Sequence, residues 1–265
     1  MNKKFAICLN NKIENSIIVK DNLEEIFRSN AIDYKVLDTE NLENGFDFVF
    51  VIGGDGTILK TARYYSDFQT PVLGVNLGRL GFLSQATPDD LPSTVNKVLN
   101  GEFKVEQRMM LGSEKYCALN DFVVKGSATG RTSRFALEIN GKFVCEYLAD
   151  GIIISTPTGS TAYSMAAGGP VLAPQTEAIT VVPICPHTFS ARPIVVPSSD
   201  EIKIIPCPNN EYTVSVDGQT VFELDKELVI NKLEKKAYLA LLNGNDFYSV
   251  LRNKLQWGIS PAKMK

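Results

Sequence analysis

The chain has 265 residues, of which 44% are hydrophobic and 22% are charged, a composition typical of a folded globular protein rather than a disordered one. Its formal net charge of -3 lacks the basic excess of proteins that coat nucleic acid or anionic membranes. No apolar run is long enough to span a membrane, and the apolar stretch at residues 5–9 is too short for a signal peptide. We therefore expect a cytoplasmic protein that has neither nucleic acid nor a membrane as a partner.

The cysteines are odd in number, far apart in the chain and without a CxxC pair. This spacing argues against a disulfide framework and against a zinc site. We expect them to be buried free thiols in a reducing compartment. They are Cys8, Cys117, Cys145, Cys185 and Cys207.

The first hundred residues alternate between short apolar runs, typical of buried strands, and segments with helical periodicity. Such alternation predicts a parallel sheet with helices on its faces. Strands are expected at residues 5–9, 34–37, 46–52 and 71–75, and helices at 16–29, 57–65 and 87–99.

The helix that begins at Thr87 has clear start and stop signals. A threonine cap precedes Pro88 and two acids, which favour the positive end of a helix, and Gly101 stops it. Its apolar face is expected to comprise Leu91, Val95, Val98 and Leu99.

Beyond about residue 103 the pattern changes to short β segments. Asn140-Gly141 and Asp217-Gly218 each separate two apolar runs, and such pairs supply the positive φ angles of a type I′ hairpin turn. Further strands are expected at residues 152–155, 178–183, 201–205 and 228–233. We therefore predict an α/β domain with a Rossmann-like parallel sheet at 1–101 and a mainly β sandwich at 102–265, whose last residues are able to pack back on the first domain.

The segment Gly53-Gly54-Asp55-Gly56-Thr57 follows the strongest predicted strand and opens a helix. Glycines there let a phosphate approach the backbone, and the helix N-terminus supplies N–H groups and positive potential. The carboxylate of Asp55 would repel phosphate, so its presence here needs a reason. A catalytic role provides one, if the carboxylate accepts the proton of an attacking hydroxyl or holds a metal. The plainer interpretation is a tight turn in which Asp55 caps the helix.

A second glycine-rich turn lies in the run from Gly74 to Gly81, which also follows a predicted strand. The chain contains neither a G-x-x-x-x-G-K-[ST] loop nor a G-x-G-x-x-G fingerprint, because Asn76 stands at the second glycine position of the latter. This turn either lines the same crevice or only bends the chain.

Two further segments are rich in polar groups. Asn120-Asp121 is able to bind a ribose diol or an adenine edge, although for the pair alone a capped turn is the favoured interpretation. The stretch at 155–164, from Ser155 to Ser164, has an unusual density of hydroxyls, which suits an anionic or polyhydroxyl ligand, and Tyr163 is able to stack on a planar ring. A surface loop rich in Ser and Thr is the alternative for this stretch.

His187 is the single histidine of the chain, so any nucleophilic triad would have to use it. A dyad of Cys185 and His187 stays open, but two residues so close on an extended strand do not point at each other. A structural or ligand-contacting role for His187 is the simpler interpretation.

Together these segments resemble the NAD kinase family, in the family's order and over most of the chain. The GGDGT element is shared with diacylglycerol kinases, sphingosine kinases and phosphofructokinase-like enzymes, whereas the TPTGSTAYS and PHT-x-SARP elements are far more specific. Asp121 stands where many members have glutamate, which changes the reach but keeps the carboxylate. The matching residues are Gly53-Gly54-Asp55-Gly56-Thr57, Leu80-Gly81-Phe82-Leu83, Leu119-Asn120-Asp121, Asp150-Gly151, Thr156-Pro157-Thr158-Gly159-Ser160-Thr161-Ala162-Tyr163-Ser164, Pro186-His187-Thr188 and Ser190-Ala191-Arg192-Pro193.

The resemblance implies an α/β domain, a β domain and an active site in the cleft between them. It implies transfer of the γ-phosphoryl group of ATP, or of another phosphoryl donor, to the adenosine ribose 2′-hydroxyl of NAD, with Asp55 as general base. Phosphates would be held near Gly53, Gly54, Gly56 and Thr57. The dinucleotide would be bound by Asn120, Asp121, Asp150, Thr158, Thr161, Ala162, Tyr163, Ser164 and Gln219.

The resemblance further implies a homo-oligomer, a dimer or tetramer in which some of these residues reach a neighbour's site. A divalent cation, normally Mg²⁺, accompanies the triphosphate, and we assign no residue as its ligand. Two alternatives stay open: a GGDGT lipid kinase, against which the TPTGSTAYS segment argues, and a non-enzymatic NAD sensor, which would be expected to lose Asp55.

Overall fold

A computed structural model of the chain describes residues 3–78, 81–127, 132–207, 211–243 and 246–255. The chain divides into two compact units: Met1–Gln107 together with Ala237–Lys265, and Arg108–Lys236. We expected the change of architecture near Gly101; the structural division falls after Gln107, and the chain returns to the first unit after Lys236. Strands β6 and β17 contain these two division points.

The first unit is built on a parallel sheet in the order β2-β1-β3-β4. The edge of β4 is extended by β5 and by the end of β17, where Leu239 pairs with Val72, both in parallel orientation. Its strands are β1 (Lys4–Leu9), β2 (Asp33–Asp38), β3 (Phe48–Ile52), β4 (Val72–Val75), β5 (Ser84–Ala86), the start of β6 (Phe103–Ser113) and the end of β17 (Leu228–Leu242). Its helices are α1 (Glu14–Ser29), α2 (Asp55–Tyr65), η1 (Ser66–Phe68), η2 (Pro88–Asp90), α3 (Leu91–Leu99) and α5 (Phe247–Leu255).

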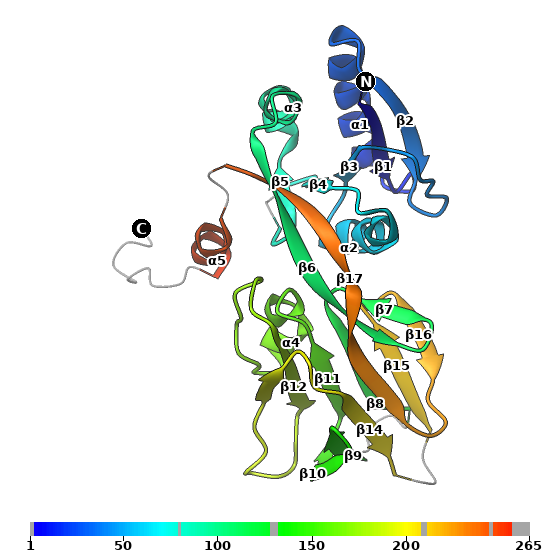
Figure 1. Cartoon of the computed structure of the whole chain (residues 1–265), viewed down its shortest axis with the longest axis vertical. Helices are drawn as coiled ribbons and strands as arrows, with labels where there is room; N and C mark the ends of the chain where they lie inside the picture. The colour runs from blue at the N-terminus through cyan, green and yellow to red at the C-terminus, as the bar shows by residue number, and fades with distance from the viewer. Residues whose placement is uncertain (1–2, 79–80, 128–131, 208–210, 244–245, 256–265) are drawn as a thin grey trace. The chain divides into compact units, whose positions relative to one another are not determined.

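Helices cover both faces of this sheet, because its strands are apolar on both sides. Residues of α1 and α3 pack with Phe5, Ile7 and Leu9, which point to one face of β1. Cys8, which points to the opposite face, contacts Tyr65 of α2. This arrangement confirms the predicted α/β architecture with a parallel sheet (Figure 1).

The second unit contains two antiparallel sheets (Figure 1). One has the order β10-β9-β14-β17, with β6 paired to β17 and β7 paired to β6, and the other has the order β13-β12-β11-β8-β15-β16. Besides parts of β6 and β17, its strands are β7 (Tyr116–Ala118), β8 (Asp121–Gly126), β9 (Ser133–Ile139), β10 (Lys142–Ala149), β11 (Gly151–Ser155), β12 (Ala178–Ile184), β13 (Ile194–Pro197), β14 (Ile202–Pro206), β15 (Tyr212–Val216) and β16 (Thr220–Glu223). Two short helices, η3 (Gly159–Thr161) and α4 (Tyr163–Ala166), follow β11.

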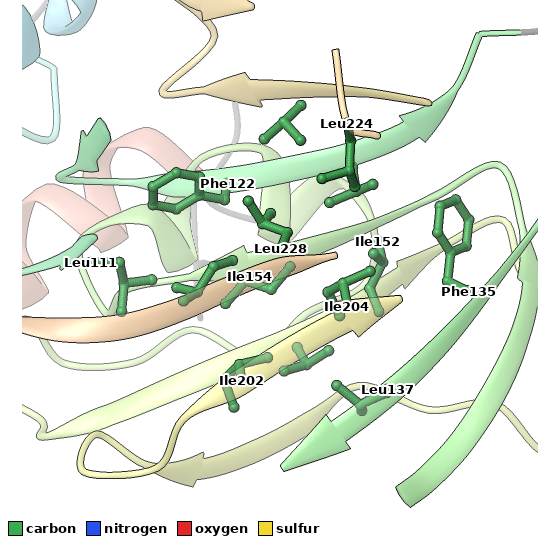
Figure 2. Packing of buried hydrophobic residues seen from close by; sticks show 14 of the residues in the cluster. Leu111, Phe122, Phe135, Leu137, Ile152, Ile154, Ile202, Ile204, Leu224 and Leu228 are labelled. Carbon is green, nitrogen blue, oxygen red and sulfur yellow. The ribbon is translucent and has the colours of Figure 1, made fainter. Parts of the chain in front are cut away.

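The apolar core of the second unit lies between the two sheets, as Figure 2 shows for Phe122, Ile154 and Ile204. Residues in a strand alternate between faces, so Phe122 and Val124 of β8 enter this core while Asp121, Val123 and Lys125 point to the opposite face. The expected β sandwich is therefore confirmed, and its outward face is free to build a site.

Both predicted hairpin turns form. Asn140 and Gly141 have φ of 52° and 71°, and Asp217 and Gly218 have φ of 51° and 65°, as a type I′ turn requires. They join β9 to β10 and β15 to β16.

Two expectations about side chains are wrong. Leu99 is 40% exposed, because the buried face of α3 is formed at the spacing of Leu91, Val95 and Val98. Of the five cysteines Cys8 alone is buried, and Cys185 is exposed in the loop after β12. Among the described residues no helix combines the length and the apolar character needed to cross a membrane.

Candidate active site

Asp55 is the first residue of α2, directly after β3 and the turn at Gly53 and Gly54. Its half-buried carboxylate accepts the N–H of Phe82 through Oδ2 at 3.0 Å and the N–H of Leu83 through Oδ1 at 3.3 Å. The helix N-cap is Gly54, and it makes no side-chain cap hydrogen bond. The interpretation of Asp55 as a helix cap is therefore wrong, since its carboxylate is held by a distant backbone segment.

Glycines make this arrangement possible. A Cβ at Gly53 would lie 2.6 Å from Oγ1 of Thr57, so only glycine fits beneath the first turn of α2. Gly54 and Gly56 are exposed residues at the N-terminus of α2, the positive end of the helix, which attracts phosphate. Residues 53–57, which we call the Asp55 turn, thus lead from β3 into the first turn of α2, as the sequence predicts.

The second glycine-rich turn contacts Asp55 and does more than bend the chain. A Cβ at Gly81 would collide with the Asp55 carboxylate, and the Gly81 N–H is anchored on Oγ of Ser84 at 2.5 Å. The ring of Phe82 lies under the ammonium of Lys254 from α5, 5.0 Å from the ring centroid. Arg79 and Leu80, which belong to the same predicted segment, lie outside the described residues.

In the second unit, Leu119, Asn120 and Asp121 lead into β8. Their three consecutive N–H groups donate to the carboxylate of Asp217, at 3.0, 2.7 and 3.0 Å respectively. The N–H of Asp217 returns a hydrogen bond to the carbonyl of Asp121 at 2.9 Å. Asn120-Asp121 is thus more than a capped turn, because a residue 96 positions away in the chain holds it.

A cavity of about 310 Å³ opens on the outward face of the β8 sheet. It brings together four of the predicted residues: Asn120, Asp121, Ala162 and Tyr163. Its floor follows the alternation of β8 and β15, where Lys125 pairs with Thr213 and Val123 with Ser215. The lining is Asn120, Asp121, Val123, Lys125, Ala162, Tyr163, Thr213, Ser215, Asp217 and Gly218.

The cavity is lined by both acidic and basic side chains. Burial, and then the negative charge of Asp217, raise the pKa of the Asp121 carboxyl to about 7. The ammonium of Lys125 lies 4.9 Å from the centroid of the Tyr163 ring, a cation–π distance. The cavity therefore offers a buried carboxyl, an amide, an aromatic ring and a cation, a set able to bind a nucleotide.

Several hydroxyls of the 155–164 stretch hold the loop itself. Thr156 Oγ1 donates to the carbonyl of Leu119 at 2.6 Å, and Ser160 Oγ donates to the carbonyl of Pro157 at 2.6 Å. Thr158 is buried, where its Oγ1 accepts from Nη1 of Arg108 at 3.2 Å. These bonds fix the loop that presents Ala162 and Tyr163 to the cavity.

The remaining predicted residues stand elsewhere in the second unit. Within the described part of the chain, Asp150, Thr158, Thr161, Ser164 and Gln219 are not part of the cavity lining. Asp150 and Gln219 are exposed, whereas Ser164 is a buried residue of α4.

Cys185 and His187 do not lie on a strand as assumed, because β12 ends at Ile184 and Cys185 has φ of 45°. Both are exposed, and within the described ranges no hydrogen bond joins their side chains. The structure therefore offers no support for a nucleophilic dyad.

Sequence reasoning missed Lys125, Thr213, Ser215 and Asp217 as members of the site. The alternation of apolar and polar residues in β8 and β15 was the available signal for the first three. No local signal distinguishes Asp217 from an ordinary turn residue, because its partners are distant in the chain.

Known proteins share both halves of this architecture. Residues 3–103 match the family model of the ATP-NAD kinase N-terminal domain, and residues 119–240 match that of the ATP-NAD kinase C-terminal domain. The NAD kinase of Azotobacter vinelandii is 39% identical over 255 residues, covering 91% of this chain and 86% of the relative. The NAD kinase of Chromohalobacter salexigens is 44% identical over 224 residues, covering 80% of this chain and 76% of the relative.

Solved structures of other proteins have a similar fold. A crystal structure of an NAD kinase from Archaeoglobus fulgidus in complex with ATP has a TM-score of 0.80 at 27% identity, covering 96% of this chain and 98% of that one. Yeast NADH kinase complexed with NADH has a TM-score of 0.85 at 23% identity, covering 99% of this chain and 90% of that one, and shows a shared fold. The matched segments include both the Asp55 turn and the cavity at Asn120 and Asp121. The chain therefore belongs to the NAD kinase family.

Proposed function

We propose that this chain transfers the γ-phosphoryl group of ATP to the adenosine ribose 2′-hydroxyl of NAD, with Asp55 as the general base. ATP-dependent phosphorylation of NAD to NADP follows from membership of the family. The observation that carries the role of Asp55 is its carboxylate, held by two backbone N–H groups at the N-terminus of α2. A carboxylate at that point is of no use for binding phosphate, but it is able to accept the proton of the attacking hydroxyl.

The Asp55 turn supports this chemistry in two ways. Gly54 and Gly56, both exposed residues, lie at the positive end of α2, which attracts the phosphates of the donor. The bonds from Phe82 and Leu83 hold the carboxylate in one orientation, which reduces the motion that has to be lost when the reacting atoms meet.

The cavity of the second unit is proposed to hold the adenosine half of NAD. Asn120 and Asp121 supply an amide and a carboxyl for the ribose or the adenine edge, and Tyr163 supplies a ring for stacking. An acyl chain in the same place would leave the buried carboxyl of Asp121 without a polar partner, at a cost of about 1–3 kcal/mol. This cost favours a nucleotide over a lipid as acceptor.

Mg²⁺ is proposed to arrive with the triphosphate as part of the substrate. Among the described residues no three His, Cys, Asp or Glu side chains are grouped as metal ligands. When bound, the cation offsets charge on the phosphates. We further propose a cytoplasmic enzyme that works as a homo-oligomer, a dimer or tetramer.

The test offers labelled ATP and Mg²⁺ to the purified protein with NAD, diacylglycerol vesicles and sphingosine vesicles in parallel. We expect labelled NADP, with the phosphate at the 2′ position by mass and linkage analysis, and no labelled lipid. Labelled lipid without NADP would contradict the proposal. Binding of NAD without any NADP would indicate a sensor instead.

A further inference from the structure

We infer that Asp217, in the turn between β15 and β16, is a positioning residue for NAD binding. It acts by holding the backbone from which Asn120 and Asp121 reach the cavity. The inference rests on the proposed role of these two residues as contacts of the adenosine half. In this role Asp217 contributes hydrogen bonds to the backbone of the binding site and takes no part in the chemical step.

The carboxylate of Asp217 gathers three consecutive backbone donors. Oδ2 accepts from Leu119, and Oδ1 accepts from both Asn120 and Asp121. A row of N–H groups turned toward one anion is an arrangement that a carboxylate satisfies well and a neutral group satisfies poorly. Asp217 is 9% exposed, so water offers little replacement if the carboxylate is removed.

The same backbone is held from its other side by the 155–164 loop. The carbonyl of Asn120 accepts the N–H of Thr156 at 2.8 Å, and the carbonyl of Leu119 accepts Oγ1 of Thr156 at 2.6 Å. A Cβ at Gly159 would lie 2.7 Å from the Cα of Asn120, so the loop rests directly on this segment. The N–H groups of this segment donate to Asp217 and its carbonyls accept from Thr156. The backbone is thus held on both sides, which fixes the point from which the Asn120 and Asp121 side chains extend at the cavity.

A turn requirement alone does not explain Asp217. Asn140 occupies the same position of the other type I′ turn, with φ of 52° against 51° for Asp217. The Asn140 side chain donates to Oδ1 of Asp200 and accepts the N–H of Glu201, both at 2.9 Å. Among the described residues, Asn140 and its partners Asp200 and Glu201 are not part of the cavity lining. The chain thus contains a matched turn residue that has long-range hydrogen bonds but no connection to the site.

The experiment compares Asp217→Ala, Asp217→Asn and the control Asn140→Ala in steady-state assays with NAD and ATP varied separately. We expect Asp217→Ala to raise the KM for NAD about tenfold or more, while the KM for ATP stays within about twofold, because the affected groups are backbone donors at the adenosine cavity. Asp217→Asn keeps the turn and one acceptor oxygen, so it should lie between wild type and alanine. Asn140→Ala should lower the melting temperature without changing the KM for NAD.

Two results would overturn the inference. One is a KM for NAD that is as unchanged in the Asp217 variants as in Asn140→Ala. The other is a parallel rise of both KM values, which would indicate general loosening of the fold. If Asp217→Ala does not fold, the same comparison is decided by Asp217→Asn. Failure of the proposed function is distinguishable, because the wild-type protein would then make no NADP.

Discussion

Three aspartates show how the surroundings of one kind of side chain set its use. Asp55 is half-buried and held by two N–H groups, so its carboxylate is oriented but still accessible. Asp217 is buried against three N–H groups, which satisfy its charge. Asp121 is buried beside that charge, and its pKa is raised for this reason. We therefore expect different consequences when each loses its charge.

Replacing Asp55 with asparagine should remove most of the turnover. The shape of the side chain is kept, but an amide cannot accept the proton, and loss of general base catalysis costs on the order of 10²–10⁴-fold in rate. We expect the KM for NAD and the melting temperature to stay close to wild type. The measurement is kcat with thermal unfolding on the same preparation, and a wild-type kcat would show that another group is the base.

The stability of the free protein should depend on pH through Asp121. The pKa of this carboxyl is about 7 in the folded chain, whereas an aspartate in an unfolded chain has a pKa of about 3.9. Between these values the folded state binds a proton that the unfolded chain has released, so the contribution of Asp121 to the free energy of unfolding falls as pH rises from about 4 to about 7. Asp121→Asn cannot ionise and should therefore lose this dependence.

Melting temperatures measured between pH 4 and pH 9 without NAD test this expectation. Asp121→Asn should melt higher than wild type above pH 7, and the difference should disappear near pH 4. Asp225→Asn is the matched control, because Asp225 is an exposed carboxylate of the same unit and its loss should leave the wild-type profile unchanged. Identical profiles for wild type and Asp121→Asn would refute the expectation.

At the scale of secondary-structure elements, the residues proposed to bind and react lie mainly in turns that directly follow strands. The Asp55 turn follows β3, the second glycine-rich turn follows β4, and the 155–164 loop follows β11. The two glycine-rich turns follow parallel neighbours, so they meet at one edge of the sheet, where Phe82 and Leu83 reach Asp55. Contact between these turns is what orients the proposed base.

Two glycine substitutions in the second turn should therefore behave differently. Gly81→Ala places a methyl group against the Asp55 carboxylate and should lower kcat by about tenfold or more, because misplacement of a reacting group by about 1 Å can cost on the order of 10²-fold. Gly78→Ala meets nothing within 4 Å and should keep a kcat close to wild type. Equal kcat values in the two folded variants would mean that the contact of the second glycine-rich turn with Asp55 does not position its carboxylate.

At the scale of the whole chain, the end of β17 completes the sheet of the first unit. Leu239 is 1% exposed and pairs with Val72, although more than 160 residues separate them in the chain. The N–H of Leu242 donates to Oε1 of Gln85 at 3.0 Å. The first unit therefore depends on residues that are synthesised after the second unit.

Leu239→Ala should lower the free energy of unfolding by about 2–5 kcal/mol, the usual cost of a cavity at a fully buried leucine. Leu241→Ala is the matched control: the same substitution two positions further along β17, at a half-buried side chain, should cost clearly less. Urea unfolding curves of the two variants provide the comparison. Equal costs would argue against the inclusion of this strand in the apolar core.

Much of the architecture is encoded locally and was predictable. The hairpins at Asn140-Gly141 and Asp217-Gly218 follow from turn chemistry within a few residues. The parallel sheet follows from the alternation of apolar runs with helical periodicity. The strand expected at 228–233 continues instead to Leu242, because Glu234, Lys235 and Lys236 interrupt its apolar pattern without ending the strand.

The site divides in the same way. Its motifs, and with them the family, are readable from the sequence, since GGDGT and TPTGSTAYS are continuous in the chain. The contact of Phe82 with Asp55 and the three bonds to Asp217 are not readable, because no local pattern specifies which distant N–H groups a carboxylate will meet. These hydrogen bonds depend on strand order and register, which bring turns from separate parts of the chain into contact.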